Sequence, residues 1–392
     1  MLDFDYGPQT LSSYGFGETY PSDGQIASLV PQVKSKSGVR FGCRIFLRSQ
    51  ESFARILDRA RLCEKLGFDS IFIDDHLLYG TDEASAPDPF TTLAALGATS
   101  KRLGVGVAVT DLIRRHPAIL AQTSATLAAM FPGRFFLGLG TGDPMNQTPF
   151  GMSSSQSFSV LEEGLKVMRM LWASSMKDPV NHKGRFFSLK NAYLQVGHTP
   201  HPPPVYLGAL GERMLKLTGE SADGWIPGVH NPETYGKDLS VIQSAAASVG
   251  RKLDSFVASY YALASTSTKR DVADKNVLGP AKYFLALIPE GLRKIDPTAK
   301  HPGRIWEKIA HPKAQREKIH KIAATIPDAT ALSTVIHGTS GDCIEQIDEY
   351  RKSGCQNFML TFVSREGLWS VKGLVPMLRY FSTKVISYFQ SK

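Results

Sequence analysis

Cysteine is scarce in this 392-residue chain. None of its four thiols belongs to a C-x-x-C pair, so the sequence contains neither a zinc-ribbon motif nor a dithiol redox motif, and we predict no metal site. Four thiols are also too few for a disulfide-stabilised fold of this length. We therefore predict reduced thiols and a cytoplasmic protein. The cysteines are Cys43, Cys63, Cys343 and Cys355.

Long apolar runs are absent, since no stretch approaches the roughly 18 residues of a membrane-spanning helix. The first ten residues, MLDFDYGPQT, lack the basic and apolar regions of a secretory signal. Phosphate-binding fingerprints are missing as well. The segment Gly138–Asp143 (GLGTGD) continues into Pro144, where a dinucleotide-binding turn requires a glycine. A doubly wound nucleotide-binding sheet is therefore the weaker alternative for the fold.

Positive charge is in excess, with 45 Lys and Arg against 36 Asp and Glu and a formal net charge of +9. Most of the excess lies between Lys269 and Lys321, where 13 basic residues accompany 6 acidic ones. These basic residues lack the aromatic interleaving used to stack bases, and no nucleic-acid module is present. We expect a solvated helical insertion or a surface that attracts an anionic ligand, rather than a binder of nucleic acid or of a membrane surface.

Short apolar runs alternate with segments of helical periodicity from residue 39 onward. Strands that are apolar on both faces and separated by helices predict a parallel sheet. Eight such units predict an α/β fold, the (β/α)8 TIM barrel with insertions. The predicted strands are residues 39–47, 70–74, 103–110, 135–140, 204–209, 224–227, 258–265 and 357–363.

The chain divides into three predicted parts. Residues 1–38, rich in Gly, Ser, Pro and Tyr, form an irregular N-terminal arm. Residues 39–365 form a single barrel domain, and residues 366–392 form a C-terminal helical tail. A basic helical insertion at about residues 269–325 precedes the last barrel strand, so we expect it to border the substrate cleft.

Polar residues that directly follow barrel strands are the candidates for catalysis, because active sites of this fold lie at the carboxyl ends of the strands. Each candidate segment alone also fits a turn or a helix cap. Together they place a histidine and two acids across one barrel mouth, which suits proton transfer near neutral pH. The last segment leads directly into a helix, whose free N–H groups favour phosphate. The segments are Asp74–His76, Thr110–Pro117, Thr141–Asn146 and Gly208–Glu212.

A family resemblance is carried by four segments: FIDDH (Phe72–His76), GVAVTDLIRRHPAILAQTSATL (Gly106–Leu127), PGRFFLGLGTGD (Pro132–Asp143) and PVYLGALGERMLKLTGESADGW (Pro204–Trp225). They resemble the bacterial luciferase-like superfamily of flavin and deazaflavin barrels. The branch that uses coenzyme F-420 is the most similar. R-H-P-A and G-R-x-x-L-G-x-G-x-G-D resemble methylenetetrahydromethanopterin reductases. V-T-D-x-x-R-R-x-P and an insertion with Trp306 and His311-Pro312 resemble phthiodiolone ketoreductases. The resemblance spans roughly residues 39–365.

The resemblance implies a deazaflavin across the barrel mouth that exchanges hydride through C5 with a carbonyl, alcohol or iminium substrate. It implies His76 as the leading proton donor or polariser, Asp75 as the residue that positions His76 or the cofactor, and Asp143 as a second acid/base candidate. A non-prolyl cis peptide is implied near Val107–Ala108. The implied cofactor contacts are Asp75, Val107, Ala108, Thr110, Thr141, Gly142, Asn146, Gly208, Ala209, Gly211 and Glu212.

The same superfamily supplies the alternative function, an FMN-dependent monooxygenase that reacts with oxygen and depends on a reductase. Under either hypothesis the partner is a small-molecule substrate, with no nucleic acid and no membrane span. Relatives often form dimers, so the resemblance implies a homodimer. The sequence leaves a pterin imine, a lipid ketone and a secondary alcohol open as substrates. Arg114 and Arg115 fit either attraction of an anionic cofactor or ordinary surface charge before a helix.

Overall fold

The structure, a computed structural model, describes residues 37–49, 51–79, 81, 83–196, 202–303, 312–365 and 373–392. The predicted arm at residues 1–38 therefore lies almost wholly outside the described residues, as do Trp306 and His311. Within the described ranges, no helix combines the length and the apolar character needed to cross a membrane. All four cysteines are buried free thiols.

Eight parallel strands close into a barrel, which confirms the predicted fold. The circuit closes between the first and last strands, where Arg40 pairs with Asn357. It is completed where Trp225 pairs with Ala258. In barrel order the strands are β1 (Arg40–Arg44), β2 (Ser70–Ile73), β3 (Gly104–Thr110), β4 (Phe135–Leu139), β7 (Val205–Leu207), β8 (Gly224–Trp225), β9 (Val257–Thr266) and β11 (Asn357–Phe362).

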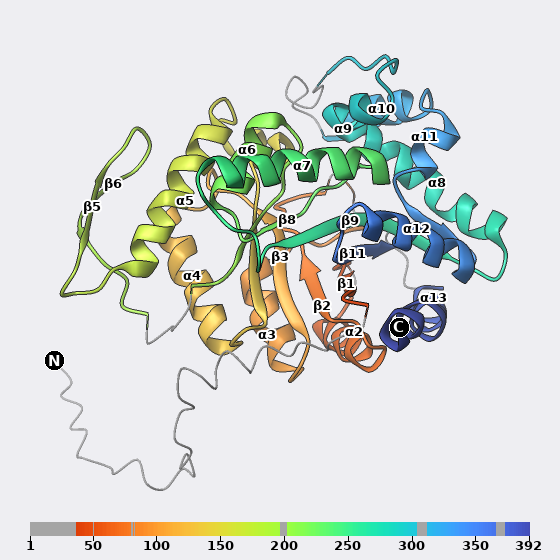
Figure 1. Ribbon diagram of the computed structural model, residues 1–392, viewed down its shortest axis with the longest axis horizontal. Helices are drawn as coiled ribbons and strands as arrows, with labels where there is room; N and C mark the ends of the chain where they lie inside the picture. Colours follow the sequence, from red (N-terminus) through yellow and green to blue (C-terminus); the bar gives the residue numbers. More distant parts are fainter. Residues whose placement is uncertain are drawn as a thin grey trace, which may run out of the picture.

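Helices between the strands cover the outside of the barrel (Figure 1). Local capping signals fix several helix starts, as at Asp88, whose carboxylate accepts the Thr91 N–H before a proline-initiated helix. Asn231 and Thr234 form a reciprocal capping box at another. The covering helices are α2 (Phe53–Lys65), α3 (Pro89–Ala98), α4 (Pro117–Met130), α5 (Ser157–Ala173), α6 (Glu212–Ser221), α7 (Pro232–Ser248) and α12 (Ser340–Lys352).

Side chains fill the barrel interior, so the barrel is a packed core and not a pore. Phe136 and Tyr206 stack there with ring centroids 5.2 Å apart. A Cβ added at Gly106 would lie 2.3 Å from the Phe136 ring, so this glycine makes room for the aromatic layer. The inward cluster is Phe72, Phe136, Tyr206, Ile226 and Met359.

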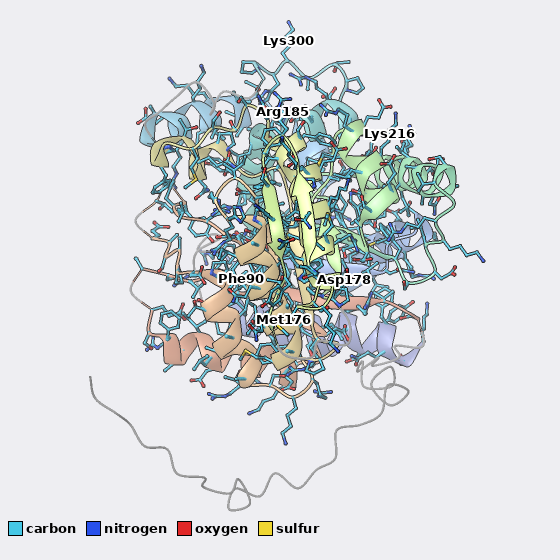
Figure 2. The ribbon with its side chains drawn as sticks, turned by 90° about the vertical axis from the view of Figure 1, so that its left-hand side faces the viewer. Phe90, Met176, Asp178, Arg185, Lys216 and Lys300 are labelled. Atoms are coloured by element: carbon cyan, nitrogen blue, oxygen red, sulfur yellow. The ribbon has the colours of Figure 1, made fainter. Side chains whose placement is uncertain are left out.

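Three strands were missed by the sequence prediction. β10 (Ile336–Gly338) pairs with β9 on the edge opposite β11, because Ala264 pairs with both Ile336 and Phe362. It is only three residues long, too short for a periodic signal. An antiparallel hairpin of β5 (Val180–Lys183) and β6 (Ser188–Ala192) is polar and largely exposed, so no apolar run marked it. Figure 2 shows the hairpin in front of the barrel, with Arg185 near one end and Asp178 near the other.

The basic insertion folds into α8 (Arg270–Leu287), α9 (Pro289–Ile295) and α10 (Pro312–Ala323), followed by α11 (Asp328–Leu332). In Figure 1 these helices lie at the side of the barrel toward which the arrow of β2 points, the carboxyl end. Lys300 projects from the outer end of the insertion in Figure 2. The insertion shares a small core with the barrel, made by residues that include Val277, Leu285, Val229 and Leu263.

The described part of the C-terminal tail is helical, with α13 (Leu374–Phe381), a π-helical turn (Ser382–Ile386) and α14 (Ser387–Ser391). Phe381 and Phe389 pack their rings 5.7 and 5.8 Å from that of Phe41 in β1. The Ser382 hydroxyl donates to the Leu66 carbonyl just before β2. Because Phe41 and Leu66 lie near the starts of β1 and β2, the tail closes the amino end of the barrel and leaves the carboxyl end open.

Candidate active site

A cavity of about 1170 Å³ lies at the carboxyl ends of the barrel strands. Its lining brings together residues from all four candidate segments, with Asp111 and Arg114 coming from Thr110–Pro117. Three other predicted residues, Val107, Thr110 and Asn146, are instead buried behind it. The predicted residues in the lining are Asp75, His76, Ala108, Thr141, Gly142, Asp143, Gly208, Ala209, Gly211 and Glu212.

The floor of the cavity lies at the end of β3. The cis peptide implied by the resemblance is present there, but it joins Ala108 to Val109, one bond later than expected. The pairing register of β3 with β4 shifts between Val107 and Thr110, which places the irregularity at this point. Added Cβ atoms at Gly140 and Gly208 would lie 2.9 and 3.4 Å from Val109 methyl groups. These glycines therefore keep the space around Val109 open.

Asp75 is the centre of a buried ion network. Its carboxylate accepts the Thr110 hydroxyl at 2.5 Å, Arg115 Nε at 2.7 Å and Arg114 Nη1 at 3.1 Å. Arg114 also donates to the Asp75 backbone carbonyl at 2.6 Å and to Asp111 at 2.6 Å, and Arg115 continues to Asp88 at 2.6 Å. Burial alone would raise the pKa of Asp75, but the Arg115 hydrogen bond and the two arginine charges together lower it.

This network answers the question left open for the two arginines. The side chain of Arg114 is only 6% exposed and that of Arg115 27% exposed, so neither is an ordinary surface charge. Ion pairs with Asp75, Asp111 and Asp88 neutralise their charges, so the two arginines contribute little to the attraction of an external anion. Their effect is to hold the turn after β2 against the turn after β3.

Asp74 belongs to a different buried pair. Arg44, the last residue of β1, forms a hydrogen-bonded ion pair with the Asp74 carboxylate. The other guanidinium nitrogen donates to the Tyr261 hydroxyl at 2.7 Å, and Tyr261 also accepts the Thr361 hydroxyl at 3.1 Å. Sequence reasoning missed Arg44 and Tyr261. Arg44 had a usable signal, since it is a charged residue at the end of an apolar strand.

His76 lies half-buried in the cavity wall with its ring centroid 4.6 Å from that of Tyr79. Its Nδ1 is buried and has no hydrogen-bond partner among the described residues. Burial, followed by the nearby charges of Arg44 and Arg114, lowers the pKa of His76 to about 3 despite the opposing charge of Asp75. The imidazole is therefore neutral near pH 7, so one ring nitrogen donates a hydrogen bond and the other accepts one.

Asp143 differs from His76 in the direction of its shift. Its Oδ1 accepts the Met145 N–H at 2.9 Å and so caps a short 3-10 turn (Pro144–Asn146). Burial raises the pKa of Asp143, against the opposing effects of the Met145 amide, the Asn146 side chain and Arg114. A carboxyl group whose pKa is raised above its usual range is suited to donating and accepting a proton.

Asn146 connects these two groups. Its side-chain oxygen accepts the N–H groups of Leu77 at 2.6 Å and Leu78 at 2.9 Å, directly after His76. The residue is 1% exposed and does not line the cavity, so in the structure it positions the His76 loop. Its Nδ2 is buried without a partner among the described residues.

The Gly208–Glu212 segment forms the opposite rim and leads into α6. Gly211 is the N-cap of α6, no side chain caps the helix there, and nothing lies within 4 Å of the position where its Cβ would be. The first N–H groups of α6 therefore have no side-chain cap. Lys294 of α9 donates to the Leu210 carbonyl at 2.6 Å and pairs with Asp238, which also binds His230 at 2.8 Å. The insertion is thus tied to this rim, a contact that no sequence signal indicated.

No group of three or more His, Cys, Asp or Glu side chains in the described part of the chain is arranged to hold a metal ion. The sequence matches the model of the luciferase-like monooxygenase family over residues 37–357. The chain belongs to this family. The fold, the position of the cavity and the cis peptide at the end of β3 agree with what the resemblance implied.

Two curated relatives of this luciferase-like protein are oxidoreductases. An F-420-dependent glucose-6-phosphate dehydrogenase of Microbacterium testaceum is 35% identical over 55% of this chain and 65% of its own length, so the match leaves out more than a third of that enzyme. A phthiodiolone/phenolphthiodiolone dimycocerosates ketoreductase of a Mycobacterium species is 30% identical over 74% of this chain and 80% of its own length.

Two solved structures share the fold over nearly the whole chain. An F-420-dependent secondary alcohol dehydrogenase, in complex with an F-420–acetone adduct, is 25% identical with a TM-score of 0.72 and covers 89% of this chain and 98% of its own. The coenzyme F-420-dependent tetrahydromethanopterin reductase of Methanopyrus kandleri is 20% identical with a TM-score of 0.69 and covers 90% and 99%. The second likeness supports the fold alone.

Proposed function

We propose that this luciferase-like protein is a coenzyme F-420-dependent oxidoreductase that transfers a hydride between the deazaflavin C5 and a carbonyl, alcohol or iminium carbon. The observation that carries the proposal is the pairing, in one cavity, of a neutral His76 with an Asp143 whose pKa is raised. Hydride transfer to or from a carbon bearing oxygen or nitrogen needs a proton to move as well. The names of the F-420-dependent relatives support the choice of cofactor.

The residues at the cavity floor fit a flat heterocyclic ring. Gly140 and Gly208 leave room around Val109, where added Cβ atoms would crowd its methyl groups. His76 Nδ1, buried without a protein partner in the described ranges, is available to a ligand atom. The uncapped start of α6 beside Gly211 fits the anionic part of such a cofactor. Bound there, the deazaflavin supplies the carbon that gives or takes the hydride.

We assign the proton to Asp143 and the orienting hydrogen bond to His76. In alcohol oxidation the carboxylate of Asp143 accepts the hydroxyl proton, and in carbonyl reduction its carboxyl group returns it. His76, neutral because of its lowered pKa, holds the substrate oxygen through a ring nitrogen. This assignment differs from the one implied by the resemblance, in which His76 was the leading proton donor and Asp143 the second candidate. Asp75, held by Arg114 and Arg115, fixes the backbone that carries His76.

A second candidate is an FMN-dependent monooxygenase, because the matched family is described by that activity. Titrating the purified full-length chain with F-420 and with FMN, followed by fluorescence, distinguishes the two. We expect F-420 to bind at micromolar concentration and FMN at least ten-fold more weakly. Micromolar binding of FMN without binding of F-420 would reject the proposed function.

A variant at the cavity wall tests the chemistry apart from binding. We expect His76→Ala to lower kcat on the order of a hundred-fold, the scale of one lost orienting or proton-transfer group. Affinity for F-420, measured by the same titration, should stay within a few-fold of wild type. Wild-type turnover in this variant would remove His76 from the mechanism.

A further inference from the structure

The basic insertion presents an apolar surface to the cavity, which we call the α8 wall. It consists of three side chains from the last turn of α8 and the residue that follows: Tyr283, Phe284, Leu287 and Ile288. Their spacing of three and four residues places them on one side of the helix end. Ile319 of α10 continues this lining. The segment that carries most of the net positive charge therefore meets the interior of the cavity with aromatic and aliphatic groups.

The side chains of the α8 wall are half-buried because they face the cavity and not the core shared with the barrel. The neighbouring face of the same helix is fully packed, with Val277, Ala281 and Leu285 each no more than 1% exposed in the core shared with the barrel. The side chains of the α8 wall are of similar apolar character but only partly covered. An apolar helix face that remains uncovered inside a concave site is the kind of surface that ligand pockets use.

The buried positive charge that lines the cavity is already paired with acids. Arg44 is paired with Asp74, and Arg114 with Asp75 and Asp111. Arg213, whose guanidinium stacks over the Phe158 ring at 3.9 Å, lines the cavity from an exposed position. From the insertion, Arg316 lines the cavity from an exposed position on α10. A phosphorylated substrate against the α8 wall would therefore lose its hydration without gaining a buried cationic partner there.

We propose that the substrate carries an elongated apolar chain next to its reacting carbon and that this chain lies against the α8 wall. The substrate class is an alkyl or aryl-alkyl ketone, or the corresponding secondary alcohol, rather than a sugar phosphate. The proposal rests on the proposed function. In the reducing direction the carbonyl carbon gains a hydride from reduced deazaflavin, the carbonyl oxygen gains a proton from Asp143, and the deazaflavin is left oxidised. The alcohol is oxidised by the reverse transfers.

A homologous series of 2-alkanones from four to ten carbons tests the proposal. Binding is measured by calorimetry to the protein with oxidised F-420, where ketones cannot turn over, and to the protein alone. Each methylene that is buried contributes about 0.8 kcal/mol, which corresponds to roughly a four-fold gain in affinity. The gain should stop when the alkyl chain is longer than the part of the cavity beside the α8 wall. A flat series, or tighter binding of glucose 6-phosphate than of 2-nonanone, would overturn the proposal. Failure of F-420 to bind would instead count against the proposed function, and the series with the protein alone would still test the wall.

Leu287→Ser, with Val272→Ser as its matched control, locates the chain on α8. Val272 lies on the same helix, is 36% exposed and does not line the cavity. We expect Leu287→Ser to weaken binding of 2-nonanone about ten-fold while binding of 2-butanone and of F-420 stays unchanged, and Val272→Ser to change none of these affinities. Equal losses for both ketones, or for both variants, would remove the wall from substrate binding. If Leu287→Ser does not fold, the chain-length series alone decides.

Discussion

The two walls of the cavity are built from different kinds of interaction. The wall from β1 to β3 consists of buried charges that are hydrogen-bonded to one another, such as Asp75 with Arg114 and Arg115. The wall from the insertion consists of half-buried apolar groups such as Phe284 and Leu287. Hydrogen bonds to charged groups are directional and fix atoms in place. Apolar contact is non-directional and tolerates variation in ligand shape. The charged wall therefore suits fixed chemistry, and the apolar wall suits selection of a substrate.

The two walls also differ in how they respond to mutation. A buried ion pair contributes little net stability, but removing one partner leaves an uncompensated buried charge. An apolar side chain that is only partly covered costs less to replace because part of it already meets solvent. Substitutions should therefore cost most in the ion network of the charged wall, less at the rim where the insertion meets α6, and least at the single carboxyl group of Asp143.

Arg114→Met should destabilise the protein most. The change leaves the carboxylates of Asp75 and Asp111, each with a side chain 1% exposed, without a main partner. We expect the free energy of unfolding to fall by about 3–5 kcal/mol, measured by urea denaturation. Arg61→Met is the matched control, because Arg61 pairs with Asp58 at the surface and should cost at most about 1 kcal/mol. Equal costs for the two variants would mean that the charged wall is not held by its ion network.

Lys294→Met tests the contact that joins the insertion to the cofactor side of the cavity. Lys294 donates to the Leu210 carbonyl and pairs with Asp238. Hydrogen bonds to charged groups contribute about 1.5–3 kcal/mol, so loosening this rim should weaken F-420 binding roughly ten-fold. The titration is repeated with Lys237→Met, whose exposed partner Glu233 lies on the same helix as Asp238. Unchanged F-420 affinity in Lys294→Met would show that the contact of Lys294 with Leu210 and Asp238 does not contribute to cofactor binding.

Asp143→Asn should give the smallest change in stability, and its sign is informative. Burial raises the pKa of Asp143 above the unfolded value of about 3.9. The folded protein then binds this proton more tightly, so its contribution to stability is complete below about pH 3.9 and is lost as pH rises through the raised value. Asparagine has no charge to bury and retains an oxygen for the Met145 N–H. We expect the variant to gain stability relative to wild type as pH rises from about 4 to 7, measured by urea denaturation at each pH.

The same variant checks the proton assignment through a pH–rate profile. In wild type the rate of ketone reduction should fall as pH rises through the raised pKa of Asp143. The profile should show no change in rate near pH 6.5 from His76, because the pKa of His76 is lowered to about 3. Asp143→Asn should remove the fall in rate and lower kcat. A change in rate near pH 6.5 that survives in Asp143→Asn would return proton transfer to His76.

The barrel and the positions of Asp75, His76 and Asp143 in the cavity lining were predictable because each signal was local. Apolar runs marked the eight strands, and the positions after them carried Asp75, His76 and Asp143. Thr110 and Asn146 were found by position, but their predicted cofactor contact remains a prediction, since in the structure they support the Asp75 and His76 turn from behind. The hairpin of β5 and β6 escaped prediction because it has no apolar run, and its turn is held by the distant Glu163, which accepts N–H bonds from three successive residues beginning at Arg185. The predicted homodimer and cytoplasmic location remain predictions.

Local sequence patterns were enough to predict the alternation of strands and helices, the barrel mouth as the place of the site, and the concentration of positive charge in one insertion. These follow from periodicity and composition, which are properties of neighbours along the chain. Only the tertiary structure decided which charges neutralise one another, that Arg114 and Arg115 serve Asp75, and that the insertion turns an apolar face of α8 inward while Lys300 points outward. Those outcomes depend on pairs such as Arg114 with Asp75 and Lys294 with Leu210, which lie 39 and 84 residues apart in the sequence and meet only when the barrel closes.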